Sequence, residues 1–336
     1  MTINLRLSLL LLGGIIVFFN TMTAATATQK TEAEETFALM LEAGNLSEAQ
    51  KIYSATADIS MAQRLVTAYI DAGNLSSADE VFQTMLLMDA KKDIIISRGQ
   101  CAEKLAIAYS EEGSYASLIK VQRIFSKIEA SSNIYYISEQ NIGKTLVQLY
   151  AKHYSLEDLQ TLYDELVFDE KSAGSFLLLA LAEHLVSTYM DKNDFSSADA
   201  VYASLYDDGN HNPSFSVPVT QAMITGYLNA GDVNKAYDFF KMGTDGADLD
   251  LALADLAQSR VSLDLAVALI ASGNLDAAYT IYTNTATFKF SDSVLHICAL
   301  MGQNLVIANL DKGNTEIAAS VYASMAKLGE SENVQP

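Results

Sequence analysis

Apolar residues recur along the chain at the spacing of amphipathic helices, and the helices come in pairs. In a segment such as Leu65–Phe82, a leucine lies eight residues before a glycine and a tyrosine lies four residues before it. Two large side chains at i and i+4 mark one face of a helix. A small residue follows five residues after the glycine, and a bulky pair follows at eight and nine residues, which predicts a second, closely packed helix.

The paired segment recurs about eight times, each time around one turn residue. Glycine or asparagine in this place can adopt the left-handed conformation that ends a helix, and the Asn-Leu-Ser that often follows supplies capping groups. After a first interval of 29 residues, the intervals run from 38 to 42 residues. The short first interval fits either a compact capping unit or a first segment that packs differently. The turn residues are Gly44, Gly73, Gly113, Tyr154, Asn193, Gly231, Gly273 and Gly313.

The spacing of the repeated positions resembles that of the tetratricopeptide-repeat family. Leu65, Tyr69, Ala78 and Phe82 reproduce the family's L-x3-Y, Y-x8-A and A-x3-F spacings. The resemblance covers residues 36–328 and implies an all-α, right-handed superhelical solenoid of about eight antiparallel helix-turn-helix repeats. The segment MITGYLNAGDVNKAYDFF is also similar to pentatricopeptide repeats, a family that binds RNA.

Three features depart from the tetratricopeptide pattern. The period is near 40 residues rather than 34, and the closing proline is absent. We expect the extra length to lie in longer first helices, such as Ser97–Glu112 and Phe176–Asp191. The position of the family's tryptophan holds small residues: Ala62, Ala102, Gly143, Ala182, Thr220, Ser262 and Gly302. Apart from these three departures, Asn309 replaces the tyrosine in the last repeat, which predicts a cap that exposes one face to water.

The N-terminus has the layout of a secretory signal peptide. Arg6 precedes the apolar run Leu7–Phe19, and a small-residue stretch ends at Ala25-Thr26-Ala27. The alternative, an uncleaved anchor, needs roughly 20 apolar residues to span a bilayer, and this run is shorter. We therefore predict a signal peptide over 1–27, a short lead over 28–35 and a flexible tail over 329–336. Cleavage near Ala27 would place the protein in the periplasm or outside the cell.

Composition narrows the classes of partner and chemistry. The chain has 336 residues, a net charge of −20, 3 Pro and 2 Cys. The scarcity of proline suits long helices, and the negative charge argues against binding to phosphate backbones. Cys101 and Cys298 lie on the first helices of the third and eighth repeats. That separation predicts two unpaired, buried thiols.

No catalytic or metal-binding constellation is evident. Ser117 and Lys120 match the first element of a serine acyltransferase motif, but its partner motifs are missing, and we expect Ser117 on a second-helix surface. The histidines form no metal-ligand spacing. We therefore predict no enzyme activity, no cofactor and no metal site. The histidines are His153, His184, His211 and His296.

The resemblance implies a binding groove on the first helices, which line the concave side in the tetratricopeptide family. We expect an exported, non-catalytic scaffold that binds a protein or peptide there, with basic or polar partners, without nucleic acid and without membrane insertion after cleavage. The alternative is an accessory subunit of a cell-envelope or secretion complex that acts through its convex face. The oligomeric state stays open. The candidate groove residues are Gln63, Thr67, Asp71, Glu103, Glu111, Lys144, Gln148, Lys152, Glu183, Asp191, Gln221, Thr225, Asn229, Gln303 and Asp311.

Overall fold

The described part of the chain is built from helices. A computed structural model describes residues 31–88, 91–129, 136–168, 176–205, 217–244, 260–286 and 292–330, and every regular element in these ranges is a helix. The predicted all-α class is confirmed. The predicted signal peptide, most of the tail and His211 lie outside the described residues. Residues 31–42 are helical, so part of the segment predicted as a lead is helix.

Contacts divide the chain into two compact units, one up to His153 and one from Tyr154 on. The boundary falls at the only turn position whose residue is neither glycine nor asparagine. Whether residues 36–328 form one array therefore stays a prediction, as does a right-handed superhelix. Beyond residues 31–42, the helices of the first unit are α2 (Leu46–Thr56), α3 (Ile59–Asp71), α4 (Leu75–Leu86), α5 (Lys92–Glu112), α6 (Tyr115–Glu129) and α7 (Tyr136–His153).

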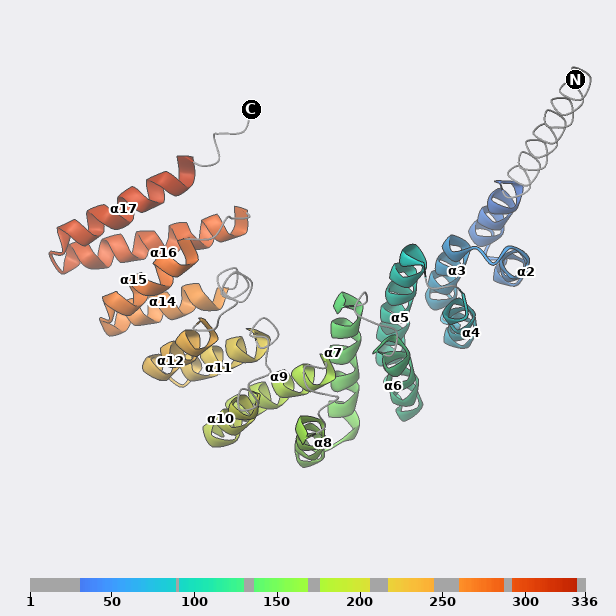
Figure 1. The fold of residues 1–336 in the computed structure, drawn as a ribbon, viewed down its shortest axis with the longest axis horizontal. Helices are drawn as coiled ribbons and strands as arrows, with labels where there is room; N and C mark the ends of the chain where they lie inside the picture. The colour runs from blue at the N-terminus through green and yellow to red at the C-terminus, as the bar shows by residue number, and fades with distance from the viewer. Residues whose placement is uncertain are drawn as a thin grey trace, which may run out of the picture. The chain divides into compact units, whose positions relative to one another are not determined.

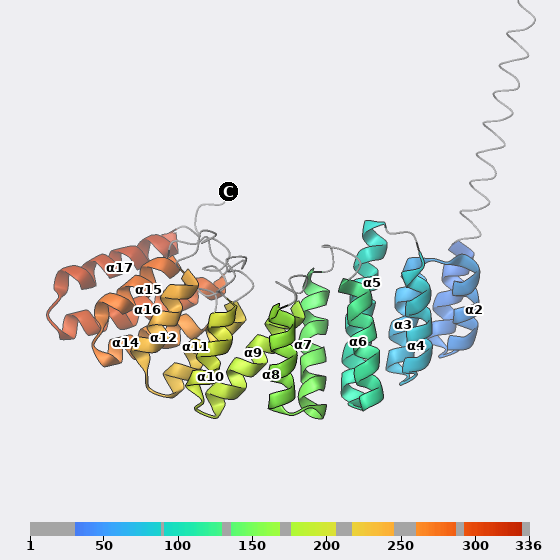
Figure 2. The same ribbon diagram turned by 60° about the horizontal axis from the view of Figure 1, so that its bottom comes forward.

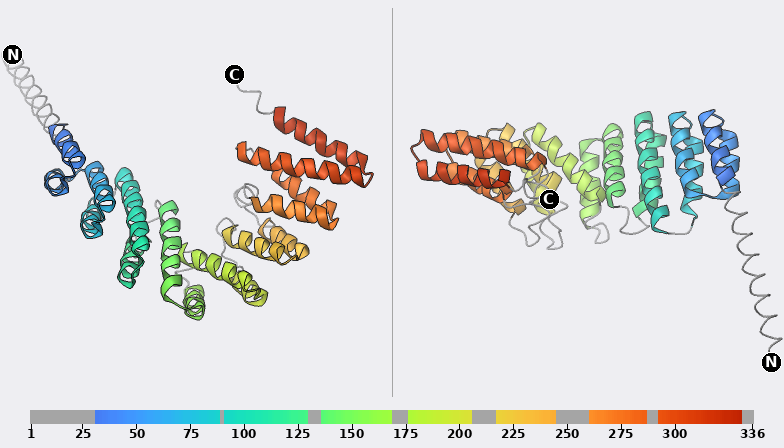
Figure 3. Two further views of the ribbon diagram at one scale, coloured as in Figure 1. Left: turned by 180° about the vertical axis from the view of Figure 1, so that it is seen from behind. Right: turned by 90° about the horizontal axis from the view of Figure 1, so that it is seen from above.

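The second unit continues the same alternation of first and second helices. In this unit α9, α11, α14 and α16 are first helices, and each contacts the next one along the chain (Figure 1). The second helices pack against them as antiparallel partners (Figures 2 and 3). The helices are α8 (Leu156–Phe168), α9 (Phe176–Asp191), α10 (Phe195–Ser204), α11 (Val217–Asn229), α12 (Val233–Thr244), α14 (Arg260–Ser272), α15 (Leu275–Ala286), α16 (Asp292–Asp311) and α17 (Thr315–Glu330).

The turn chemistry predicted from the repeats is confirmed at seven of the eight turn residues. Six glycines and Asn193 have positive φ, whereas Tyr154 does not. At Gly73, for example, φ is +72°, a conformation that a side chain would strain. The next residue, Asn74, accepts a 3.1 Å hydrogen bond from the Ser77 amide and so caps α4.

The small residues at the family's tryptophan position have a packing reason. A Cβ added to Gly302 would lie 2.5 Å from the Met325 Sδ and 3.2 Å from the Tyr282 ring. At the equivalent position two interfaces earlier, Thr220 makes a 3.1 Å hydrogen bond with the Tyr202 hydroxyl. At these two interfaces the tyrosine nine positions past the turn, Tyr202 or Tyr282, therefore fills the space that a tryptophan would occupy in the next repeat.

Tyrosine hydroxyls tie three of the first helices, α3, α9 and α11, to the second helix of the preceding repeat. The tyrosine lies four residues before its turn, and its partner lies six residues after the previous turn. Because these partners are 19 to 29 residues apart, the contact fixes the register of neighbouring repeats. The pairs are Tyr69 with Gln50, Tyr189 with Gln160 at 3.0 Å and Tyr227 with Asp199 at 2.8 Å.

The position of Asn309 corrects one prediction. Its side chain is 1% exposed rather than turned to water. The Nδ2 donates to the Leu305 carbonyl at 2.9 Å, and the Oδ1 accepts from the Asn314 Nδ2 at 3.2 Å. Asn309 can be buried because both polar atoms of its side-chain amide have hydrogen-bond partners within the protein and therefore do not require water.

Several first helices hold the extra length of the repeat, as predicted for α5 and α9, whereas α11 and α14 have 13 residues each, the same as the second helix α8. Helix α5 has 21 residues and α16 has 20, whereas the second helix α10 has 10. Within the described ranges, the part of α16 over Val294–Asp311 is long and apolar enough to cross a membrane by length and composition. Since α16 packs against α14, α15 and α17, a core helix of a helical array accounts for the same pattern.

Candidate functional site

The fifteen predicted groove residues all lie on first helices, and none of them is buried. Eight are in the first unit, on α3, α5 and α7, and seven are in the second unit, on α9, α11 and α16. The two groups differ in what their side chains already contact.

In the first unit, a ladder of polar contacts joins successive first helices. The residue ten positions before one turn bonds to the residue thirteen positions before the next turn. Likewise, the residue six positions before one turn bonds to the residue nine positions before the next turn. Gln100, Lys104 and Asn141 belong to this surface, although they were not among the predicted groove residues. Their polar character at a fixed offset from the predicted residues was the available signal. The pairs are Gln63 with Gln100 at 2.7 Å, Thr67 with Lys104 at 3.2 Å and Glu103 with Asn141 at 2.7 Å.

The two lysines among the groove candidates on α7, Lys144 and Lys152, are also engaged with the protein. The Lys152 Nζ donates to the Ser110 carbonyl at 3.2 Å, and the Lys144 side chain is half-buried. Next to Lys152, the His153 ring contacts the Gly113 carbonyl at 3.1 Å. A ligand on the first unit's face would therefore compete with existing contacts between the helices.

In the second unit, α9 and α11 form a cavity of about 320 Å³ on the first-helix face. Five of the predicted groove residues line this cavity together, although they come from two repeats. Val261 of α14 closes one side. The predicted residues are Glu183, Asp191, Gln221, Thr225 and Asn229.

The floor of this cavity depends on a close approach of the two helices. Met190 of α9 and Gly226 of α11 both line it. A Cβ added to Gly226 would lie 2.5 Å from the Met190 Cγ. The missing side chain of Gly226 therefore makes room for Met190 between the two helices. The polar side chains that line the cavity lie around this contact.

The cavity is electronegative. Its charged lining residues are both acids, Glu183 and Asp191. His184 follows Glu183 along α9, and burial lowers the pKa of its imidazole below the usual value of 6.5. The imidazole is therefore mostly neutral at pH 7 and adds little positive charge near the acids. Such a cavity favours a cationic or hydrogen-bond-donating group.

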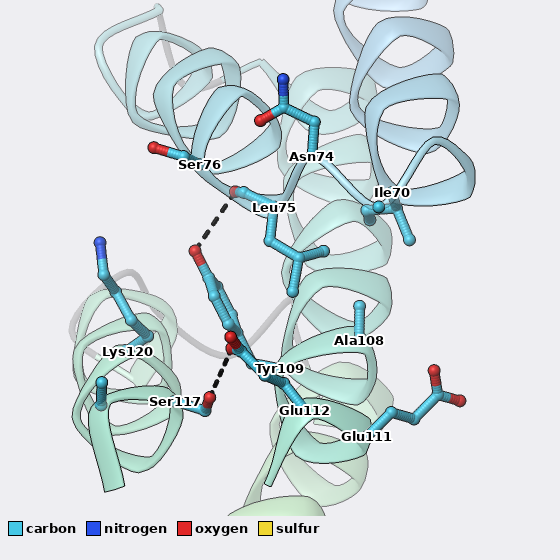
Figure 4. A pocket seen from close by; sticks show the side chains of 12 residues that line it. Ile70, Asn74, Leu75, Ser76, Ala108, Tyr109, Glu111, Glu112, Ser117 and Lys120 are labelled. Atoms are coloured by element: carbon cyan, nitrogen blue, oxygen red, sulfur yellow. Dashed lines mark hydrogen bonds between the residues drawn. The ribbon is translucent and has the colours of Figure 1, made fainter. Parts of the chain in front are cut away.

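A larger cavity of about 680 Å³ lies in the first unit, at the turns between α3 and α4 and between α5 and α6 (Figure 4). Of the predicted groove residues only Glu111 lines it. The Tyr109 hydroxyl donates to the Leu75 carbonyl at 3.2 Å. This cavity is therefore distinct from the first-helix face.

Ser117 lies in the wall of that cavity, buried rather than on a second-helix surface as expected. Its hydroxyl donates to the Glu112 carboxylate at 2.6 Å, and its amide donates to Ser114 Oγ at 3.0 Å. The Lys120 amine points away from it in Figure 4 and bonds to Asp79 at 3.0 Å. Ser117 is buried because it completes the N-terminal cap of α6, and this arrangement does not activate a nucleophile.

Cysteine, histidine and acidic side chains do not assemble into a metal site in the described ranges, where no group of three of them lies close enough to hold an ion. Both cysteines are free and fully buried, as predicted. Burial raises the pKa of the Cys101 thiol to about 12 and that of Cys298 to about 11, which keeps both thiols protonated and unreactive.

One family match includes part of the cavity-lining helix α11. A model of the PPR repeat, the pentatricopeptide repeat, matches residues 221–242, which cover most of α11 and α12. Among curated proteins, none matches the sequence. The match covers one repeat, and together with the paired helices it is consistent with a tetratricopeptide-like helical repeat protein. Repeat folds of this class are commonly scaffolds that bind protein or RNA, and they are typically non-catalytic.

Proposed function

We propose that the protein is an exported, non-catalytic scaffold that binds a basic or polar segment of another protein on the first-helix face of its second unit. The observation that carries the proposal is the cavity between α9 and α11. It gathers five of the predicted groove residues and presents two carboxylates, Glu183 and Asp191, with hydroxyl and amide groups around them. A lysine or arginine side chain fits this combination of charge and hydrogen-bond acceptors.

Protein is a better partner than RNA for this surface. The match to the PPR repeat covers α11, whose side chains in the cavity are the neutral Gln221, Thr225 and Asn229. Opposite them α9 presents only carboxylates as charged groups. A phosphate backbone would meet repulsion both from these groups and from the net charge of −20.

Binding is tested with the full chain by fluorescence anisotropy. The probes are a 12-residue lysine-containing peptide, its glutamate-substituted counterpart and a single-stranded RNA. We expect only the lysine peptide to bind, and the double substitution Glu183→Gln with Asp191→Asn to weaken it about tenfold, because partly exposed ion pairs contribute about 0.5–1 kcal/mol each.

The matched control removes the same charge elsewhere in the second unit. Glu157→Gln with Asp276→Asn alters two exposed acids on the second helices α8 and α15. This variant should keep the affinity of the unaltered chain. Tighter binding of RNA or of the glutamate peptide would contradict the proposal, as would equal losses in both variants.

Export is a separate part of the proposal and rests on the leader pattern over residues 1–27. Removal of the leader after Ala27 would make Thr28 the new N-terminus. Mass spectrometry of the N-terminal peptide from cell fractions tests this. A chain retained inside the cell with residues 1–27 intact would contradict it.

A further inference from the structure

The first-helix face of the second unit changes from polar to apolar along the chain. Six residues before each turn, α9 carries Ser187 and α11 carries Thr225. At the same position α14 carries Val267 and α16 carries Ile307, which are 42% and 51% exposed. The repeat register places these four residues on one face, because each first helix packs against the next.

Val267 and Ile307 belong to a larger group, which we call the apolar strip. It comprises Leu263 and Val267 of α14 and Ile307 and Leu310 of α16. Leu310 is 53% exposed, and it occupies the register position that Met190 holds in the α9–α11 cavity. Neighbouring exposed aliphatic side chains on one face are typical of an interaction surface.

The cavity and the apolar strip share helix α14. Val261, which lines the cavity, lies on α14 within two turns of Val267. Asp311 is exposed at the end of α16, so acidic character persists beyond the strip. This combination disfavours an anionic lipid surface and favours a chain that carries both positive charge and apolar side chains.

We propose that the second unit recognises a bipartite extended segment, whose basic residue occupies the α9–α11 cavity and whose apolar residues cover the strip on α14 and α16. This inference rests on the proposed function and specifies its partner. Packed helices are about 8–10 Å apart, so two helix spacings separate the cavity from the strip by about 18 Å. An extended chain covers that distance in about five or six residues.

The test compares peptides as well as protein variants. The bipartite peptide carries a lysine pair and, five residues later, two leucines; the basic peptide has serines in place of the leucines, and a third peptide shortens the spacer to one residue. All are titrated against the full chain. We expect the bipartite peptide to bind about tenfold more tightly than the other two, because only it buries apolar surface on the strip.

The protein variant is Val267→Ser with Ile307→Ser, and the control is Ile119→Ser on α6, since Ile119 is also 51% exposed. We expect the double substitution to remove the advantage of the bipartite peptide and to leave the affinity of the basic peptide unchanged. The control variant should keep both affinities. Circular dichroism verifies folding, and the comparison among peptides on the unaltered chain holds if the variant fails to fold.

The remaining outcomes separate the two proposals. Equal binding of the bipartite and basic peptides, unaffected by the double substitution, would overturn the role of the strip and leave the proposed function standing. Failure of every basic peptide to bind would overturn the proposed function itself. Self-association of the chain that the double substitution abolishes would show that a second copy covers the strip, and would also overturn the inference.

Discussion

The tyrosine contact between repeats predicts a measurable loss of stability in the variant Tyr227→Phe. The Tyr227 hydroxyl donates to the Asp199 carboxylate at 2.8 Å, and the ring stacks on Phe195 and Phe239 at 5.2 and 5.5 Å. Phenylalanine keeps both ring contacts and removes only the hydroxyl. The substitution therefore isolates the hydrogen bond that joins α11 to α10.

The size of the loss follows from the acceptor. Hydrogen bonds to charged groups contribute about 1.5–3 kcal/mol, and we expect the low end, about 1.5 kcal/mol, because Asp199 keeps Lys235 at 3.3 Å and is 36% exposed. Tyr189→Phe removes the equivalent bond to the neutral Gln160. We expect that variant to lose about 1 kcal/mol or less.

The pH dependence of the unfolding free energy tests the same hydrogen bond independently. Burial and the nearby carboxylates, first of all Asp199, raise the pKa of Tyr227 above its usual value of 10.0. A raised pKa means that the folded protein favours the protonated hydroxyl. The stabilisation is therefore complete below the unfolded pKa, near pH 10, and is lost as the pH rises toward the folded pKa. The difference between the unaltered chain and Tyr227→Phe should be constant from pH 6 to 9 and should shrink above pH 10.

The assay is urea unfolding followed by circular dichroism at 222 nm, since the chain contains no tryptophan. Hydrogen exchange of the amides of α10 and α11 locates the loss, because repeat arrays can unfold locally. A smaller loss for Tyr227→Phe than for Tyr189→Phe would refute the reasoning about the charged acceptor. A loss confined to helices outside the second unit would refute the assignment of the contact.

Two further predictions concern buried groups. Asp79→Asn should destabilise the first unit by about 2 kcal/mol, since the carboxylate is 7% exposed and binds both Lys120 and Arg123. Burial opposes ionisation of Asp79, but the hydrogen bonds led by that from Lys120 outweigh it and lower the pKa, so this stabilisation persists above about pH 4 and is lost at lower pH in urea titrations. Cys101 and Cys298 should resist a thiol reagent at pH 8 in the native chain and react fully after denaturation; absence of free thiol in both states would indicate a disulfide instead.

The repeat register determined most of the local structure. The residues that recur at fixed distances from each turn, such as Leu65 and Ala78, are fully buried. Left-handed turns follow from glycine and asparagine because few other residues adopt positive φ without strain. These features depend on neighbours a few residues away, so a single sequence is sufficient to predict them.

The candidate site was predicted in part. Register alone placed the side chains of Glu183, Asp191, Gln221, Thr225 and Asn229 on one face of the first helices. That they line one cavity depends on Gly226, which admits the Met190 side chain between α9 and α11. Packing between helices sets such a cavity, and the periodicity of one helix carries no information about it.

By itself the sequence determined the all-α class, the paired helices, their turns and the face on which polar groups gather. Only the tertiary structure decided which polar groups meet, as in the contact of Gln63 with Gln100 and the burial of Ser117 and Asn309. The physical reason is distance along the chain. Periodicity reports which face of a helix is buried, whereas contacts between residues about 40 positions apart depend on the offset between packed helices, which side-chain volumes and hydrogen bonds set together.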